Sequence, residues 1–88
     1  MMKKEFVIAN EQGLHARPAT TLVSKANQFK SQITLNYEGR SADMKSIMGV
    51  LSLGVTRGEL IEVVIEGSDE ADAMEAISKH IKEMNVNN

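Results

Sequence analysis

The sequence predicts a two-layer α+β domain, in which a four-stranded antiparallel sheet carries three helices on one face. Two observations predict it. Short runs of alternating apolar and polar residues, typical of half-buried strands, are interspersed with segments whose apolar residues recur every three or four positions, typical of amphipathic helices. Strands with one apolar face and helices with one apolar stripe pack most simply as two layers. The expected order is βαββαβα, within a single domain of residues 1–88.

The first strand and the first helix are joined by a short loop. Residues 5–9 form the strand, centred on Val7, and residues 10–13 form the loop because they are polar and end in glycine. Residues from about 16 to 27 form the helix, and Phe29 is expected to close its apolar side. The spacing that predicts the helix is that of Ala19, Leu22, Val23 and Ala26.

A hairpin follows the first helix. Ile33, Leu35 and Tyr37 alternate with polar residues, as in a strand with one buried face. The pair Glu38-Gly39 predicts a tight turn. Residues 40–43 should therefore return as a short antiparallel strand.

Residues 46–53 are ambiguous, because a short apolar run forms a helix or a strand equally well. Ser46 is a favourable N-cap, and Gly54 is a favourable stop for the last turn. These two residues favour a short second helix.

The last strand and the last helix have the strongest patterns. Residues 60–65 place Ile61, Val63 and Ile65 on one face and Glu62 on the other, and residues 67–69 are a Gly-Ser-Asp sequence that suits the start of a helix. Residues 85–88 are expected to fray. The predicted buried stripe of the last helix consists of Met74, Ile77, Ile81 and Met84.

Composition excludes several classes of function. The formal net charge is -2 and the basic residues are scattered, which argues against general nucleic-acid binding. Aromatic residues make up 3% of the chain, so no platform for stacking bases is expected. The absence of cysteine excludes disulfides, thiolate metal sites and thiol catalysis, and suits a cytoplasmic protein. Neither a signal peptide nor a membrane span is expected.

The segment Gly13-Leu14-His15-Ala16-Arg17-Pro18-Ala19 is the strongest candidate site. Pro18 is tolerated in a first helical turn, so His15 should lie at the helix N-terminus, beside unpaired N–H groups and the positive end of the dipole. Such a site favours anions, phosphate among them. A neutral imidazole is a nucleophile, and the guanidinium of Arg17 can hold phosphate oxygens. The residues therefore suggest a histidine that accepts a phosphoryl group.

An ordinary alternative stands beside this one, since a lone histidine near a helix start is more often a surface residue or an imperfect cap. Arg17, Pro18 and Gly13 favour the anion-binding interpretation over this alternative, Gly13 because glycine adopts backbone conformations that other residues resist. From the residues alone, an anion-binding helix start is about as well supported as the ordinary alternative. Covalent phosphorylation is not required by either.

A second segment of interest is Lys45-Ser46-Ile47-Met48-Gly49-Val50-Leu51. A helix this short cannot bury every side, so part of its apolar set should face solvent and form a docking patch. Core packing is the competing interpretation for Ile47, Met48 and Leu51. For Ser46, a plain N-cap is the default role, and a phosphate added there would be well accommodated.

Both segments resemble signatures of the HPr family, the histidine-containing phosphocarriers of the bacterial sugar phosphotransferase system. Residues 13–19 are similar to the active-site signature. Residues 45–50 are similar to the second signature, in its form from low-GC Gram-positive bacteria. The similarity extends over essentially the whole chain. It implies an open-faced β-sandwich of four antiparallel strands and three helices.

The resemblance also implies roles for individual residues. His15 would be phosphorylated on Nδ1, Arg17 would assist transfer, and Ser46 would be modified by HPr kinase/phosphorylase. A partner-binding surface would include Thr20, Ile47, Met48 and Leu51. A regulatory paralogue has glutamine at the active-site position, whereas this chain has His15. No role is assigned to Gln12, and His80 is expected to be a partly exposed residue on the flank of the last helix.

The implied partners are enzyme I as phosphoryl donor and the sugar-specific IIA domains as acceptors. A second class of function is a regulatory module, in which phospho-Ser46 creates a surface for the catabolite control transcription factor. An anion-binding domain without covalent chemistry is the remaining alternative. The chain is expected to be a monomeric relay protein rather than an enzyme, and to need neither cofactor nor metal.

Overall fold

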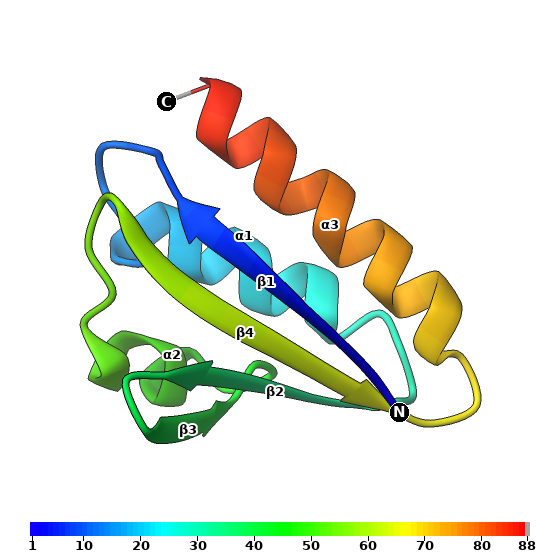
Figure 1. The fold of residues 1–88 in the computed structure, drawn as a ribbon. Coiled ribbons are helices and arrows are strands. Elements are labelled where there is room, and N and C mark those ends of the chain that lie inside the picture. The colour runs from blue at the N-terminus through cyan, green and yellow to red at the C-terminus, as the bar shows by residue number, and fades with distance from the viewer. Residues whose placement is uncertain (88) are drawn as a thin grey trace.

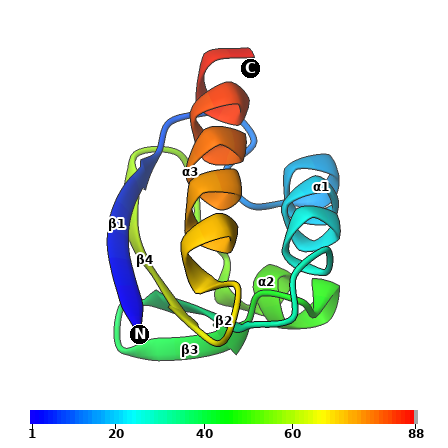
Figure 2. The same cartoon turned by 90° about the vertical axis from the view of Figure 1, so that its right-hand side faces the viewer.

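The computed structural model describes residues 1–87, and Asn88 lies outside the described residues. In this part of the chain the elements follow the order βαββαβα. They are β1 (Met2–Ile8), α1 (Ala16–Ala26), β2 (Gln32–Tyr37), β3 (Arg40–Asp43), α2 (Ile47–Leu53), β4 (Glu59–Glu66) and α3 (Glu70–Asn87). The sheet is antiparallel throughout, with strand order β1-β4-β2-β3. The two views show all three helices of this part of the chain on one face of the sheet (Figures 1 and 2). The predicted fold class is confirmed.

The register of the sheet follows the apolar alternation of β4. Ile61, Val63 and Ile65 face the helices and are almost fully buried, as are Ile33 and Leu35 on β2. β1 pairs with β4 from Met2, opposite Ile65, to Ile8, opposite Glu59. β1 therefore begins at Met2 rather than at the predicted residue 5, because its pairing with β4 extends from Glu59 to Ile65.

The helices bury the predicted stripes against the sheet. α1 buries Pro18 together with the four apolar residues that predicted it, and Phe29 is half-buried beside the core. The buried stripe of α3 is confirmed: Met74, Ile77, Ile81 and Met84. No helix of the described chain combines the length and hydropathy that crossing a bilayer requires.

The short helix α2 forms as its flanking residues predict. The Ser46 hydroxyl accepts the amide of Gly49 at 3.0 Å, and Gly54 ends the helix in the left-handed region at φ +66°. The Arg40 guanidinium donates to the carbonyl of Leu53 at 2.7 Å, placing a cation at the helix C-terminus, where the dipole favours it.

The prediction that the chain frays from residue 85 is wrong for Asn85. α3 continues to Asn87, and the Asn85 side chain forms two hydrogen bonds with the end of β1. Its carbonyl oxygen accepts the amide of Ala9, and its amide donates to the carbonyl of Val7, both at 2.9 Å. These contacts tie the last turns of α3 to the strand that leads into the loop before α1.

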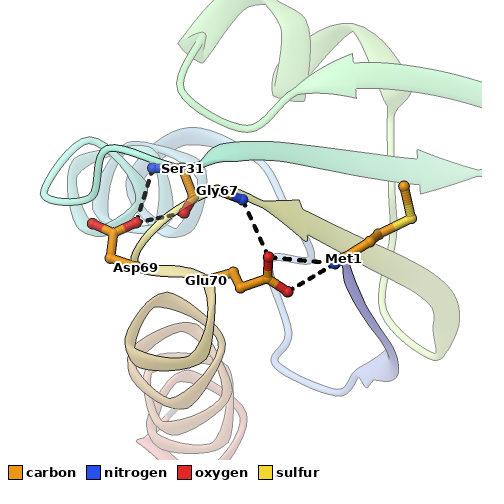
Figure 3. A network of polar contacts seen from close by, with 5 residues as sticks. All are labelled: Met1, Ser31, Gly67, Asp69 and Glu70. Carbon is orange, nitrogen blue, oxygen red and sulfur yellow. Dashed lines mark hydrogen bonds and ion pairs between the residues drawn. The ribbon is translucent and has the colours of Figure 1, made fainter.

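A polar network joins the opposite end of α3 to the N-terminal residue before β1 and to the segment between α1 and β2 (Figure 3). The Asp69 carboxylate accepts the backbone amides of Lys30 and Ser31 at 2.8 and 2.9 Å, and also the Ser31 hydroxyl. These bonds, the hydroxyl first, lower the pKa of Asp69 to about 2. Glu70 forms an ion pair of 2.9 Å with the amino group of Met1.

Candidate functional site

The candidate site lies where the loop before α1 meets the loop between α2 and β4. Gly13 has φ +60°, and a Cβ on it would stand 2.5 Å from the carbonyl oxygen of Val55. The amide of Leu14 donates to that same oxygen at 3.0 Å, and the Leu14 side chain is fully buried. Glycine is therefore required at position 13 for both its backbone conformation and its close approach. The chain is thus fixed directly before His15.

Asn10 holds the same loop from inside. Its side-chain amide donates to the carbonyl of Gly13 at 2.9 Å, while the amide of Gly13 donates to the carbonyl of Asn10 at 3.1 Å. Asn10 is fully buried, and within the described residues its Oδ1 has no hydrogen-bond partner. The polar segment that predicted this loop thus contains one buried residue, Asn10, whose hydrogen bonds with Gly13 close the loop.

The facing loop is held by the carboxylate of Glu59. It accepts the amide and the hydroxyl of Thr56, each at 2.7 Å, and also the hydroxyl of Tyr37. The Tyr37 hydrogen bond, and then those from Thr56, lower the pKa of Glu59. The same bond to Glu59 contributes most to raising the pKa of Tyr37 to about 12. Glu59 thus fixes the residue that follows Val55, while the carbonyl of Val55 itself accepts the amide of Leu14.

His15 occupies the N-cap position of α1 with an extended backbone, at φ -114° and ψ 159°. Its imidazole is exposed, and it makes no side-chain capping bond to the described chain. Ala16 follows with φ +45°, a left-handed conformation that costs a non-glycine residue roughly 1–3 kcal/mol. The strain is held in place by Leu14 on one side and by the buried Pro18 and Ala19 on the other.

This helix start has the features that bind an anion. The first amides of a helix have no intrahelical acceptor, and at α1 neither the His15 side chain nor an acidic residue in the first turn satisfies them. The guanidinium of Arg17 is exposed two residues from the imidazole. A phosphoryl group on His15 would meet amide donors, the helix dipole and a planar cation together. Within residues 1–87 no His, Asp and Glu side chains gather as a metal-binding group.

Arg17 also lines a hollow of about 290 Å³ between α1 and α3. Gln12 and Thr21 lie on its α1 side, and His80 and Glu83 come from α3. His80 is half-buried, as predicted for a residue on a helix flank. Its contact with Thr21, at 3.2 Å, could not be found from the sequence, because no local pattern relates positions 21 and 80.

The second candidate segment, residues 45–51, contacts the C-terminal end of α1. The side-chain amide of Asn27, which caps the C-terminus of α1, donates to the carbonyl of Lys45, and Lys45 Nζ donates to the carbonyl of Phe29. Ser46 follows directly. An α-helix of 11 residues is about 16 Å long, so Ser46 and His15 lie at opposite ends of α1.

The exposed apolar residues of α2 agree with one part of the docking-patch prediction. Ile47 and Met48 are 42% and 76% exposed. Leu51 is half-buried and packs against the core, so it contributes only an edge to that surface. Thr20 is exposed on α1, and its hydroxyl donates to the carbonyl of Ala16 at 3.1 Å.

Fold and site together define a class of protein: an open-faced α+β sandwich that presents one histidine, beside an arginine, at an open helix start. The family model described as "PTS HPr component phosphorylation site" matches residues 2–83. The chain belongs to the HPr family, the phosphocarriers of the phosphotransferase system.

Solved structures of this family share the whole fold. HPr-C-His from Thermoanaerobacter tengcongensis is 38% identical, with 100% of this chain and 99% of that chain covered, at a TM-score of 0.95. A Mycoplasma histidine-containing phosphocarrier protein is 32% identical, with 96% of each chain covered, at a TM-score of 0.91. Crh from Bacillus subtilis, described as a catabolite repression protein that forms a domain-swapped dimer, is 34% identical, with 96% and 97% covered, at a TM-score of 0.75.

Proposed function

We propose that His15 accepts a phosphoryl group from phospho-enzyme I and passes it to sugar-specific IIA domains. Membership of the HPr family supports a role as a phosphocarrier. The observation that carries the residue assignment is the exposed imidazole of His15 at the start of α1, with no capping bond to residues 1–87 and with Arg17 beside it. A binding protein for free anions would need no nucleophile at this position.

In the proposed step the lone pair of His15 Nδ1 attacks phosphorus. The bond from phosphorus to the donor nitrogen of enzyme I breaks as the new bond to Nδ1 forms. In a second exchange the acceptor attacks phosphorus, and the bond from phosphorus to Nδ1 breaks. Arg17 and the first amides of α1 bind the phosphoryl oxygens without forming covalent bonds, so the group stays transferable. The protein is a relay rather than an enzyme, and the step requires neither a cofactor nor a metal.

Ser46 is the proposed site of regulation. HPr kinase/phosphorylase would phosphorylate its hydroxyl, and phospho-Ser46 would then bind the catabolite control transcription factor. The position of Ser46 supports an effect through docking, because it lies at the far end of α1 from His15 and next to the exposed Ile47 and Met48. The likeness to Crh, whose description names catabolite repression, also supports this role.

The proposed partner-binding surface runs from Thr20 on α1 to Ile47, Met48 and the edge of Leu51 on α2. Complexes on so small a surface should be weak and fast, as a carrier between donor and acceptor needs. We propose that the protein acts as a monomer in the cytoplasm. Because Crh forms a swapped dimer, sedimentation of this chain across a range of concentrations is the measurement that checks its oligomeric state.

Incubation with enzyme I and phosphoenolpyruvate tests the proposal. We expect a mass increase of one phosphoryl group that is lost in acid and retained in alkali, as for a phosphohistidine. The matched measurement uses ATP and HPr kinase/phosphorylase, which should add an acid-stable phosphoryl group on Ser46. Competent enzyme I that leaves the mass unchanged would refute the carrier role and leave only the regulatory one.

A further inference from the structure

A chain of two hydrogen bonds crosses from α3 to the first turn of α1. Nε2 of His80 lies 3.2 Å from Oγ1 of Thr21, and that hydroxyl donates to the carbonyl of Pro18 at 3.1 Å. A threonine hydroxyl has one hydrogen, so the oxygen that donates to Pro18 must accept from His80. Neutral His80 therefore carries its proton on Nε2.

The surroundings of His80 favour its neutral ring. Burial, and then the charge of Lys25 on α1, lower the pKa of His80, while Glu83 on α3 opposes them. Across the shared hollow the other charged group is Arg17. Nε2 bears a proton in both the neutral and the charged ring, so the bond to Thr21 survives a change of pH.

The first turn of α1 has particular need of such a tie. Ala16, the first residue of the helix, is in the left-handed region rather than in helical geometry. The turn is therefore not fixed by regular helix geometry alone. The Thr21 hydroxyl holds the carbonyl of Pro18, and His80 holds Thr21 from the neighbouring helix. Arg17 immediately precedes the held peptide and lines the same hollow as His80.

We propose that His80 is a positioning residue: acting through Thr21, it fixes the first turn of α1 and with it the position of Arg17, two residues from His15. The inference deepens the proposed phosphoryl transfer and rests on it. His80 touches neither the phosphoryl group nor His15, so its effect is on geometry. It should change the maximal rate of transfer more than the docking of enzyme I.

The first test is independent of phosphoryl transfer. ¹⁵N chemical shifts of the His80 ring, measured at a pH where the ring is neutral, should show the tautomer with the proton on Nε2. In Thr21→Val, which keeps the shape and removes the hydroxyl, the ring should become a mixture of tautomers. A wild-type ring protonated on Nδ1 would overturn the inference.

The second test measures transfer from phospho-enzyme I across carrier concentrations. Loss of one such hydrogen bond should lower the maximal rate about three- to ten-fold in Thr21→Val and His80→Leu, with half-saturation nearly unchanged. Thr21→Ser keeps the hydroxyl and His80→Gln keeps an amide donor, so both should restore most of the rate. Asp69→Asn is the control, because it loosens α3 at its other end.

The outcomes separate this inference from the proposed function. A wild-type chain that accepts no phosphoryl group refutes the proposed function, and the inference falls with it. A wild-type chain that is active, but no faster than Thr21→Val, refutes the inference alone. Equal losses in Thr21→Val and Asp69→Asn would show a general effect of stability, and they also refute it.

Discussion

The helix starts of α1 and α2 carry the two candidate phosphorylation sites and are built in opposite ways. At α2 the Ser46 side chain accepts the amide of Gly49, so the chain caps its own helix start. At α1 the N-cap residue is His15, which makes no such bond to the described residues and is followed by Ala16 at φ +45°. The difference separates two kinds of phosphate site. Under the proposed function, the start of α1 would receive a phosphoryl group and release it, whereas the capped start of α2 would take one only when an enzyme modifies Ser46.

The largest expected effect comes from removing the nucleophile at the open helix start. His15→Ala should abolish phosphoryl acceptance from enzyme I while changing the free energy of unfolding by less than about 0.5 kcal/mol, because the ring is exposed. Mass spectrometry after incubation with phosphoenolpyruvate measures acceptance, and urea unfolding measures stability. Ser46→Ala is the matched control and should still accept the group. Acid-labile phosphate on His15→Ala, or a large loss of stability, would show that the assignment is wrong.

The next effect concerns the cation at the same helix start. Arg17→Lys keeps the charge but loses the planar fork, so transfer should slow by about tenfold, with stability nearly unchanged. Rapid-quench measurements with enzyme I and with a IIA domain follow both directions. Equal rates for variant and wild type in both directions would mean that the helix amides alone stabilise the phosphoryl charge.

A smaller effect is expected at the closed helix start. Phosphorylation of Ser46 adds about -1.5 to -2 charges beside Ile47 and Met48, and a partner must desolvate that charge on docking. Ser46→Asp should therefore raise the half-saturation concentration for enzyme I about threefold, and high salt should partly relieve the increase. Phospho-Ser46 should show the same change more strongly.

Ser46→Ala distinguishes the capping role of the Ser46 hydroxyl from the effect of a phosphoryl charge on it. It should leave transfer unaffected, remove the response to the kinase and lose about 1 kcal/mol of stability, because the amide of Gly49 loses its acceptor. If phosphorylation of Ser46 lowers only the maximal rate, the docking explanation fails. A change at His15 itself would then be the cause.

The smallest effect extends the comparison to the start of α3. The pKa of Asp69 falls from 3.8 to about 2 on folding, so its ionised form stabilises the folded protein above pH 3.8. That stability is lost as the pH falls from 3.8 towards 2. Asp69→Asn should lower the urea midpoint at pH 7 and show a shallower decline in this window.

Asp72→Asn is the control for this decline, since Asp72 is exposed in the first turn of the same helix. It should retain most of the acid-dependent loss of the wild-type protein. A decline in Asp69→Asn as steep as that of the wild type would show that other carboxylates cause it.

Much of this architecture could be predicted because its signals are local. The alternation in β2 and β4 predicted which side chains face the helices. Ser46 and Gly54 predicted where α2 begins and ends, since each satisfies backbone groups a few residues away. Gly13 predicted an unusual backbone, although not the carbonyl of Val55 that it must approach.

What could not be predicted depends on contacts between distant segments. The early start of β1 follows from its pairing with β4. The helical position of Asn85 follows from two hydrogen bonds of its side chain to the end of β1. At the candidate site, His15 and Arg17 come from one short motif. The residues that surround and hold this motif include Val55, Thr56 and His80, and no local sequence pattern relates their positions to it.

The pairing of β1 with β4 also determines when the protein can assemble. The ladder joins residue 2 to residue 65, so β1 leaves the ribosome long before its partner strand exists. Local hairpins and helices can form at once, whereas this closure waits for most of the chain and makes folding slower than in a helical bundle of equal length. During that interval the apolar residues Phe6, Val7 and Ile8 have no strand of their own chain beside them. A second copy that supplies β4 offers the same ladder, so high local concentration during synthesis or refolding favours exchange of β1 between chains.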